Sequence, residues 1–367
     1  MHIVIDARMV SDQSFGIDRY VCNLVKNLAE IDIENKYTIL VQNDILHRSI
    51  SNANFEFKYT QIKWLSPQEQ VRLPLLLKKI RPDVFHAPSF VAPWFPVCKT
   101  ILTIHDLIHL LFPEHYGLKQ RIYYKFFIKR LISSAFKVIT DSISTRNDLV
   151  AHYGIDQAKI KVIYLAADSI FRPLPEVDRI DRFKKTNGLP EKFILYVGNR
   201  KKHKNVRTLF EAFRIFKKND QAGYSLVISG TKDESTIKQA KDLGIEDWLV
   251  YAGDVKDEAL PLLYNAACLF VFPSLYEGFG FPPLEAMACG IPVIASNASS
   301  LPEVVGEAGI TINPCDVNAL SRAISKVLAS KELQKNMRQM ALDRAKMFSW
   351  AKCAKETLAV YKQIEGQ

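Results

Sequence analysis

Residues 272–296 read FPSLYEGFGFPPLEAMACGIPVIAS, and this stretch combines a strand end, a glycine-containing loop, a short helix and a second strand. The loop holds Gly278 and Gly280. The helix begins near Pro283 and stops at Gly290, because proline is tolerated in the first helical turn and glycine commonly follows the last one. The apolar run IPVIAS predicts another buried strand. The stretch therefore indicates a strand–loop–helix–strand unit of a parallel α/β sheet.

The same alternation of strand and helix continues on both sides of this unit. The strand-like runs are HIVIDA, YTILVQ, DVFHAP, TILTIHD and KVITDS in the first half and FILYVGN, YSLVISG, LVYAGD, CLFVFPS and IPVIAS in the second. Each is followed by a helix-length stretch, which is typical of parallel sheets covered on both faces. A Pro-rich, charged passage near residues 172–180 interrupts the pattern and predicts a hinge. We therefore predict two α/β domains, residues 1–172 and 173–348, and a final helix within 349–367.

The net charge of the chain indicates which classes of partner it can bind. The 49 Lys and Arg outnumber the 39 Asp and Glu, giving a formal net charge of +10. This excess favours nucleotide phosphates, anionic lipid headgroups or nucleic acid. Nucleic acid has the least support, because the sequence carries no zinc-finger spacing, aromatic RNA-binding signature or arginine-rich tail.

Cysteine spacing and hydropathy indicate the compartment. The six cysteines are scattered and form no C-x-x-C pair, which favours reduced thiols over disulfides or a metal site. The N-terminal residues MHIVIDARMV do not have the pattern of a signal peptide, and no apolar run approaches the roughly 20 residues that span a bilayer. We therefore expect a cytoplasmic protein.

The glycine loop has the outline of a phosphate site. Two glycines let backbone N–H groups approach a ligand, and the helix behind them offers a positive dipole end. Glu277 precedes the loop and Glu285 lies in the helix. Carboxylates suit sugar and ribose hydroxyls because each accepts several charge-assisted hydrogen bonds. From the residues alone, the favoured readings are a solvated loop charge for Glu277 and a first-turn helix residue stabilised by the dipole for Glu285.

The segment Glu277-Gly-Phe-Gly-Phe-Pro-Pro-Leu-Glu285, followed by AMACGIPV, resembles the E-x7-E motif of retaining GT-B glycosyltransferases of family 4, the glycosyl transferases group 1. The resemblance extends through SSLPEV at 299–304, GIDRY at 16–20 and FSW at 348–350. It implies two Rossmann-like domains with parallel sheets facing across a cleft. The N-terminal domain would bind the acceptor and the C-terminal domain the nucleotide sugar, with the last helix crossing back to the N-terminal domain.

The resemblance also implies roles for residues of the motif. Glu277 would contact the donor sugar hydroxyls and Glu285 the ribose. Backbone amides of the loop would face the sugar and diphosphate; these belong to Gly278, Phe279, Gly280 and Phe281. In the N-terminal half, Gly16 follows Ser14 and Phe15 between the first strand and first helix and would allow close approach of a ligand. A plain strand-to-helix turn explains Gly16 equally well.

Residues elsewhere match further family positions. In YVGNRKKHKNV, Lys204 corresponds to a lysine that binds the diphosphate. The resemblance implies an arginine, found in many members of the family, where Asn199 stands, so Arg200 or Lys202 is expected to replace it. His105 ends the strand ILTIHD, at the edge where α/β sheets bind ligands, and corresponds to a histidine that contacts the donor sugar. Loops containing Gly230 and Val255 would hold the base, mostly through backbone groups.

These matches together predict the reaction. His105, Lys204 and Glu277 would act in catalysis, with no cofactor or metal required, because fixed cations can stabilise the leaving diphosphate. The donor would be a GDP- or UDP-sugar and the acceptor a hydroxyl of a glycan or lipid-linked chain. The GIDRY and VGN…HKN patterns look closest to bacterial mannosyltransferases of polysaccharide and lipopolysaccharide assembly. A catalytically silent binding subunit and a GT-B sugar-nucleotide epimerase are the alternatives.

A dehydrogenase is disfavoured, because no G-x-G-x-x-G follows the first strand and GFG at 278–280 lacks a third glycine.

The basic, aromatic stretch at residues 119–132, KQRIYYKFFIKRLI, predicts a helix. Its apolar residues at helical spacing form a core stripe or contact an anionic membrane at the inner face; they are Tyr124, Phe127, Ile128, Leu131 and Ile132.

Overall fold

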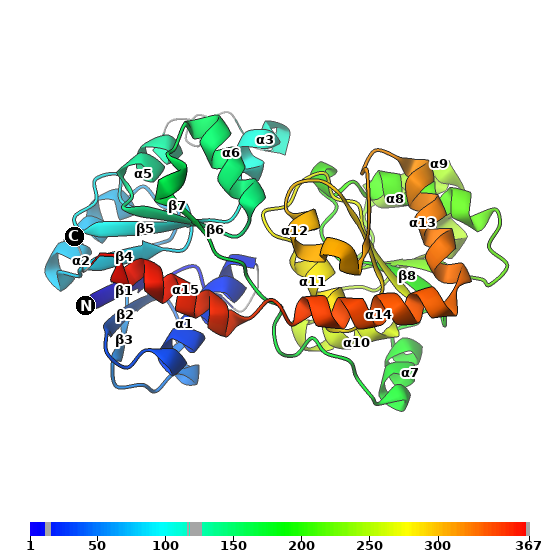
Figure 1. Cartoon of the computed structure of the whole chain (residues 1–367), viewed down its shortest axis with the longest axis horizontal. Coiled ribbons are helices and arrows are strands. Elements are labelled where there is room, and N and C mark those ends of the chain that lie inside the picture. Colours follow the sequence, from blue (N-terminus) through cyan, green and yellow to red (C-terminus); the bar gives the residue numbers. More distant parts are fainter. Residues whose placement is uncertain (12–15, 116, 118–126, 365–367) are drawn as a thin grey trace. The chain divides into compact units, whose positions relative to one another are not determined.

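The computed structural model describes residues 1–11, 16–115, 117 and 127–364, and it divides the chain into two compact units (Figure 1). Unit 1 comprises Met1–Leu165 and the segment from Ser349 onward. Unit 2 comprises Ala166–Phe348. Each unit has its own parallel sheet with helices on both faces, as the alternation of strands and helices predicts.

Unit 1 contains a seven-stranded sheet in the order β3-β2-β1-β4-β5-β6-β7, and all adjacent strands pair in parallel. Its strands are β1 (His2–Asp6), β2 (Lys36–Val41), β3 (Phe55–Tyr59), β4 (Val84–Ala87), β5 (Lys99–Ile104), β6 (Lys137–Thr140) and β7 (Ile160–Val162). Its described helices are α1 (Gly16–Ile31), α2 (Glu69–Ile80), α3 (Ile108–Leu111), α5 (Lys129–Ser134), α6 (Ile143–Tyr153) and α15 (Trp350–Lys362).

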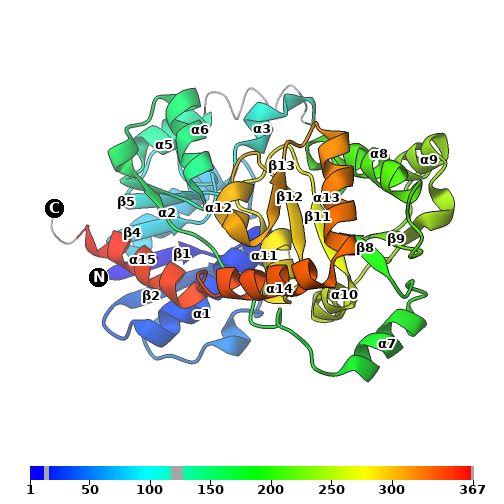
Figure 2. The ribbon, with the colours of Figure 1, turned by 45° about the vertical axis from the view of Figure 1, so that its right-hand side comes forward.

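The strands of unit 1 are buried on both faces, which explains their nearly continuous apolar runs. Val4, Phe85 and Leu102 share one core with residues of α2, α5 and α6. On the other face, α15 packs along α1, and both views show the two helices side by side (Figures 1 and 2). The expected final helix thus belongs to the N-terminal unit.

Two buried contacts fix α15 to unit 1. The hydroxyl of Tyr361 lies 2.6 Å from Nδ1 of His86 in β4, and Nε2 of His86 lies 2.8 Å from Oγ1 of Thr103 in β5. The ring of Trp350 lies 6.5 Å from that of Tyr20 in α1. The last helix is therefore held by polar as well as apolar contacts.

Unit 2 contains a six-stranded parallel sheet in the order β10-β9-β8-β11-β12-β13. Its strands are β8 (Phe193–Tyr196), β9 (Ser225–Ile228), β10 (Leu249–Tyr251), β11 (Leu269–Phe272), β12 (Val293–Ser296) and β13 (Ile310–Ile312). Its helices are α7 (Val177–Thr186), α8 (Val206–Lys217), α9 (Glu234–Leu243), α10 (Leu260–Ala266), α11 (Phe281–Ala288), α12 (Leu301–Val305), α13 (Val317–Ala329) and α14 (Lys331–Ala345). Helix α8 packs against α13, and α11 packs against α14 (Figure 2).

The first boundary between the units lies at Leu165–Ala166 rather than after Arg172. The ring of Phe171 packs edge-on against that of Tyr264, with centroids 5.7 Å apart. The side chain of Asn265 donates to the carbonyl oxygen of Arg172 at 3.0 Å. Residues just before the predicted hinge are therefore already attached to α10 of unit 2.

The basic stretch at 119–132 is only partly described. Residues 118–126, including Tyr124, lie outside the described part. Ile128, Leu131 and Ile132 are at most 2% exposed and belong to the core of unit 1. Phe127 stacks on Trp94, with ring centroids 4.2 Å apart. The core interpretation therefore holds for the described end of this stretch, and no described helix is long and apolar enough to cross a bilayer.

Candidate functional site

The predicted site residues of unit 2 follow the carboxyl ends of its strands. Strand β8 pairs with β9 on one side and with β11 on the other. The chain runs outward from β8 to β10 and then returns to β11 beside β8. Open α/β sheets bind ligands at such a reversal of strand order. The loops after β8 and β11 carry Lys204 and Glu277, so the fold brings them to the same place.

Lys204 and Glu277 form a bidentate ion pair. Nζ of Lys204 lies 2.7 Å from Oε1 and 2.8 Å from Oε2 of Glu277. Their side chains are 12% and 10% exposed, and the ammonium lies 5.5 Å from the ring centroid of Phe272. Glu277 is therefore not a solvated loop charge. A pair that is shielded but not sealed can exchange one partner for a ligand phosphate or hydroxyl.

Local bonds fix the two loops that carry this pair. Asn205 has a left-handed backbone, with φ of 56°. Its side-chain amide donates to the carbonyl oxygens of Pro273 at 3.1 Å and Pro314 at 2.7 Å. The N–H of Leu275 donates to the carbonyl oxygen of His203 at 2.7 Å. The ammonium and carboxylate are thus presented on backbone that is held at several points.

The glycine loop is supported from behind by two serines. The N–H of Glu277 donates to Oγ of Ser299 at 2.8 Å, and the hydroxyl of Ser300 donates to the carbonyl oxygen of Glu277 at 3.0 Å. Gly280 has φ of 129°, and a Cβ there would lie 3.0 Å from Cδ2 of Leu301. Both the backbone conformation and the lack of space therefore favour glycine at this position.

The aromatic residues of the loop direct their rings into the protein. Phe279 is 4% exposed. Its ring packs edge-on against Phe281 and Phe348, with centroids 5.6 and 5.9 Å apart. Gly278 and Phe281 are half-buried. The backbone of this loop, rather than the ring of Phe279, is therefore the part suited to a ligand.

Helix α11 offers fewer N-terminal donors than a regular helix. Its first three residues are Phe281, Pro282 and Pro283, and proline has no N–H. Of these three, Phe281 alone carries a backbone donor. The expected anion site at this helix end therefore depends mainly on the loop amides and on Lys204.

Glu285 projects from α11 into a buried environment. It is 3% exposed, and the hydroxyl of Tyr264 in α10 donates to its Oε2 at 2.8 Å. Both partners are buried. A buried carboxylate keeps its remaining lone pairs directed, because hydrogen bonds replace the water it has lost. Glu285 is thus a fixed acceptor rather than a mobile first-turn charge.

The loops expected to hold the base are joined to each other. The N–H of Gly230 donates to the carbonyl oxygen of Gly253 at 2.9 Å, and that of Val255 to the same carbonyl oxygen at 3.1 Å. Gly230 and Gly253 have φ of 86° and 70°. Val255 is half-buried. The two loops form one connected edge.

Arg200 contacts this edge instead of standing free for a diphosphate. Its guanidinium donates to the carbonyl oxygen of Ser229 at 2.7 Å and pairs with Asp233 at 3.0 Å. A Cβ on Gly230 would lie 3.1 Å from the same group. Asn199 is exposed, and its side chain accepts the N–H of Lys201 at 3.2 Å. Arg200 therefore orders the loop after β9, while Lys204 is the cation beside the glutamate.

Two predicted residues lie in unit 1. Gly16 is the exposed first residue of α1, and Ser14 and Phe15 before it lie outside the described residues. His105 follows β5. Its Nδ1 lies 2.6 Å from Oδ2 of Asp141, and its Nε2 lies 3.0 Å from the carbonyl oxygen of Pro88. Burial lowers the pKa of His105, but the charge and hydrogen bond of Asp141 raise it more, so the net pKa is raised.

Several supporting residues escape sequence reasoning. Tyr264 and Asp141 directly hold Glu285 and His105 but lie 21 and 36 residues away from them in the chain. The one available signal for Asp141 is its place directly after the apolar run KVIT, at the same sheet edge as His105. Ser299 and Ser300 lie in the SSLPEV segment, whose sequence does not predict that their hydroxyls support the glycine loop.

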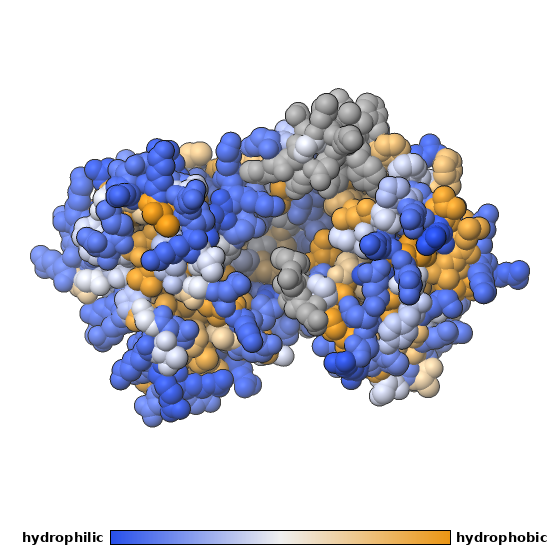
Figure 3. Space-filling view, turned by 180° about the vertical axis from the view of Figure 1, so that it is seen from behind, coloured by the Kyte–Doolittle hydropathy of each residue, from blue (hydrophilic) through white to orange (hydrophobic). Residues whose placement is uncertain are grey.

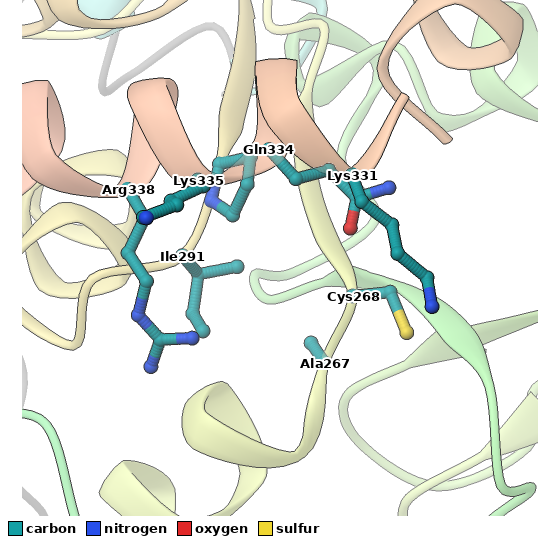
Figure 4. Close-up of a pocket in the computed structure, with 8 residues that line it drawn as sticks. Ala267, Cys268, Ile291, Lys331, Gln334, Lys335 and Arg338 are labelled. Carbon is teal, nitrogen blue, oxygen red and sulfur yellow. The ribbon is translucent and has the colours of Figure 1, made fainter. Parts of the chain in front are cut away.

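A hollow of about 390 Å³ lies at the amino ends of the unit 2 strands, opposite the predicted site. Figure 4 shows Ala267, Cys268 and Ile291 beneath the side chains of Lys331 and Arg338 from α14. These residues precede β11 and β12, so the hollow lies at the amino ends of the strands. It contains none of the predicted site residues. Within the described ranges, no group of three or more His, Cys, Asp or Glu residues is arranged to hold a metal ion.

Comparison with known proteins gives family matches over both halves. Residues 16–169 match the model described as Glycosyltransferase Family 4, and residues 177–344 match Glycosyl transferases group 1. O-antigen chain mannosyltransferase B of Escherichia coli is 33% identical over 291 residues, covering 78% of this chain and 76% of that protein. Serotype-specific mannosyltransferase WbdA of Escherichia coli is 29% identical over 346 residues, covering 88% of this chain and 42% of that protein. The chain thus spans less than half of WbdA.

Solved structures share the fold. Sucrose-phosphate synthase from Thermosynechococcus elongatus has a TM-score of 0.78 at 20% identity, covering 100% of this chain and 99% of that one. Anabaena HepE in complex with UDP and glucose has a TM-score of 0.77 at 18% identity, covering 99% of this chain and 100% of that one. These likenesses confirm the predicted fold class of two parallel α/β domains.

Proposed function

Because the chain belongs to the glycosyl transferases group 1 family and is a hexosyltransferase, we propose a specific reaction for it. In this reaction, it transfers mannose from a nucleotide diphosphate sugar. The acceptor is a hydroxyl of a glycan or lipid-linked chain in cell-surface polysaccharide synthesis. The mannose assignment rests on the two Escherichia coli mannosyltransferases. The nucleotide assignment draws support from the UDP bound by Anabaena HepE.

The observation that carries this proposal is the Lys204–Glu277 pair at the reversal of strand order, where Nζ lies 2.7 Å from the carboxylate. A nucleotide diphosphate sugar has anionic phosphates next to hydroxyl-rich sugar. A cation and a carboxylate held side by side match these two parts. Glu285, buried and fixed by Tyr264, is assigned to the ribose hydroxyls.

In the proposed reaction Lys204 and the amides of residues 278–281 stabilise the charge that develops on the leaving diphosphate. Such fixed donors lower the barrier because they need no reorganisation during the reaction. Glu277 holds the sugar hydroxyls as the glycosidic bond breaks. The acceptor hydroxyl attacks from the same face, and its proton passes to the departing phosphate. The anomeric configuration is retained, and the fixed ammonium supplies the positive charge at the phosphate.

The edge formed by Gly230 and Val255, ordered by Arg200, is assigned to the base, which is guanine or uracil. Donor binding is assigned to unit 2 and acceptor binding to unit 1, and His105 is assigned to contact with the donor sugar. We assign the exposed basic residues Lys129 and Arg130 to contact with an anionic membrane at its inner face.

A donor panel tests the proposal. GDP- and UDP-sugars are screened for an increase in melting temperature, because a ligand that binds only the folded state stabilises it. We expect one donor, a GDP- or UDP-linked mannose, to give the largest shift and to release nucleotide diphosphate when acceptor is added. Donor binding without such release would instead identify a silent binding subunit.

Calorimetry with that donor tests the ribose assignment. Glu285→Ala should lower donor affinity about 100-fold or more, because a charged acceptor of two hydroxyls is lost. Tyr264→Phe is the matched control: it keeps the carboxylate and removes one supporting bond, so its loss should be about tenfold or less. Unchanged affinity in Glu285→Ala would exclude the ribose role.

A further inference from the structure

The carboxylate of Asp141 directly follows β6 and is 3% exposed. Its Oδ2 lies 2.6 Å from Nδ1 of His105. In the described part of the chain, its Oδ1 is buried and has no hydrogen-bond partner. A buried carboxylate with one satisfied oxygen is costly unless a positive charge compensates it. The ring of His105 is the group in position to do so.

The surroundings of His105 determine its protonation. One ring nitrogen faces a carboxylate oxygen, and the other faces the carbonyl oxygen of Pro88 at 3.0 Å. A carbonyl oxygen only accepts, so Nε2 carries a proton. A proton also lies between Nδ1 and Asp141. Imidazole is a stronger base than a carboxylate, so the ring keeps that proton.

We propose that Asp141 is a positioning residue that holds His105 as an imidazolium with both N–H groups directed, so that His105 acts in transfer as a fixed donor and never as a base. The importance of this for the reaction rests on the proposed role of His105. The raised pKa of His105 has the direction that this pairing requires.

The arrangement also joins three strands. His105 follows β5, Asp141 follows β6, and Pro88 follows β4; these strands are adjacent in the sheet. The ring of Tyr20 from α1 packs edge-on against His105, with centroids 5.0 Å apart. A charged ring tied at both nitrogens therefore fixes this part of the sheet edge.

Other titratable groups near the pair act more weakly. Asp106 raises the pKa of His105. Burial, and to a smaller extent the charge of His105, lowers the pKa of His86. Burial raises the pKa values of Cys353 and Tyr20, and the charge of Asp141 adds to both increases. Asp106 uses its carboxylate to accept the N–H of Ile108 at 2.9 Å. Asp141 is thus distinguished by its direct bond to the ring.

The test combines NMR and kinetics on the full chain. Histidine Cε1–H signals are titrated in the wild type, in Asp141→Asn and in Asp106→Asn, with His105→Gln to assign the signal. We expect His105 to titrate above 6.5 in the wild type, below it in Asp141→Asn, and nearer to the wild type in Asp106→Asn. Asp141→Glu should restore part of the rise. A wild-type His105 that titrates at or below 6.5 overturns the proposal without any variant.

The kinetic arm uses the pH dependence of turnover. In the wild type, kcat should fall as pH rises through the pKa of His105, because the imidazolium is lost. In Asp141→Asn this fall should occur at lower pH, and kcat near neutrality should drop about 10- to 100-fold from poorer orientation. An unmoved pH profile contradicts the positioning role. Full activity of His105→Gln contradicts instead the proposed role of His105, while the NMR result for Asp141 still stands.

Discussion

The ammonium of Lys204 lies 2.7 and 2.8 Å from the two carboxylate oxygens of Glu277, although the residues are 73 positions apart in the chain. Strands β8 and β11 are neighbours in the sheet, so the loops that follow them meet. The pair is the point where a cation for phosphate and an acceptor for hydroxyls coincide. The two charges neutralise each other in the absence of ligand. A bound ligand would place its phosphate at the ammonium and its hydroxyls at the carboxylate.

Removal of the Lys204 charge should affect turnover more than donor binding. Lys204→Met keeps the aliphatic length but loses the cation and leaves Glu277 without its partner. We expect kcat to fall about 100- to 1,000-fold, since a fixed donor to a developing charge is worth that much. Release of nucleotide diphosphate under saturating donor measures it. Lys204→Arg is the charge-keeping control, and a kcat in Lys204→Met within threefold of wild type contradicts the role.

A side chain at Gly230 should disturb the edge assigned to the base. The residue has φ of 86°, and a Cβ would lie 3.1 Å from the Arg200 guanidinium. Gly230→Ala should therefore lower the unfolding free energy by about 1 kcal/mol and weaken donor binding. Calorimetry and thermal melting measure the two effects. Gly223→Ala is the control, because it shares a positive φ of 74° but has open space around its Cβ position. Equal donor affinity in both variants would exclude Gly230 from the site.

The buried histidine of β4 should make unit 1 sensitive to acid. Burial, with a smaller contribution from the charge of His105, lowers the pKa of His86 to about 3. The unfolded chain takes up a proton near 6.5, so the stability from neutral His86 is complete above that pH and is lost as pH falls towards 3. Between pH 7 and 5 the unfolding free energy should fall by about 2 kcal/mol through this residue.

His86→Gln tests this effect, because glutamine can still hydrogen-bond but does not titrate. Urea unfolding of the wild type and the variant at pH 7 and pH 5 gives the difference in pH dependence. The loss on acidification should be smaller in the variant. His105 works in the opposite direction, because a raised pKa adds stability at low pH, and it cancels in the comparison. A variant with the same pH dependence as the wild type would show that His86 is not the acid-sensitive group.

The fold follows from sequence where local patterns and tertiary packing agree. Runs such as HIVID and VIAS are continuous apolar stretches because both faces of each sheet are covered. The observed domain boundary differs from the predicted one after Arg172. The Pro-rich, charged composition near residues 172–180 is typical of a linker, but Phe171 already packs on Tyr264 of unit 2. Arg200 could not be assigned from sequence, because its contact with Ser229 depends on the pairing of β8 with β9. Long-range partners of this kind become visible only in the folded chain.

We extend the proposed membrane contact of Lys129 and Arg130 to Phe95, because Arg130 lies over its ring. Phe95 is 69% exposed, and the guanidinium of Arg130 lies 4.5 Å from its ring centroid. The N–H of Trp94, which precedes Phe95, donates to Oε1 of Gln70 in α2 at 2.9 Å. Val71, which follows Gln70, is 64% exposed. Apolar side chains reach the surface of unit 1 among charged ones (Figure 3).

The double substitution Phe95→Ser with Arg130→Glu should weaken binding to vesicles of anionic phospholipid. Loss of one exposed aromatic ring that would insert into the lipid, together with reversal of one charge, should lower the partition coefficient about 10- to 100-fold. Cosedimentation with anionic and zwitterionic vesicles at two salt concentrations measures this, and wild-type binding should be confined to the anionic vesicles and weakened by salt. Ile33→Ser is the matched control, because Ile33 is 82% exposed but lies beside Glu34. If the double substitution and the control bind alike, the Phe95 surface does not contact lipid.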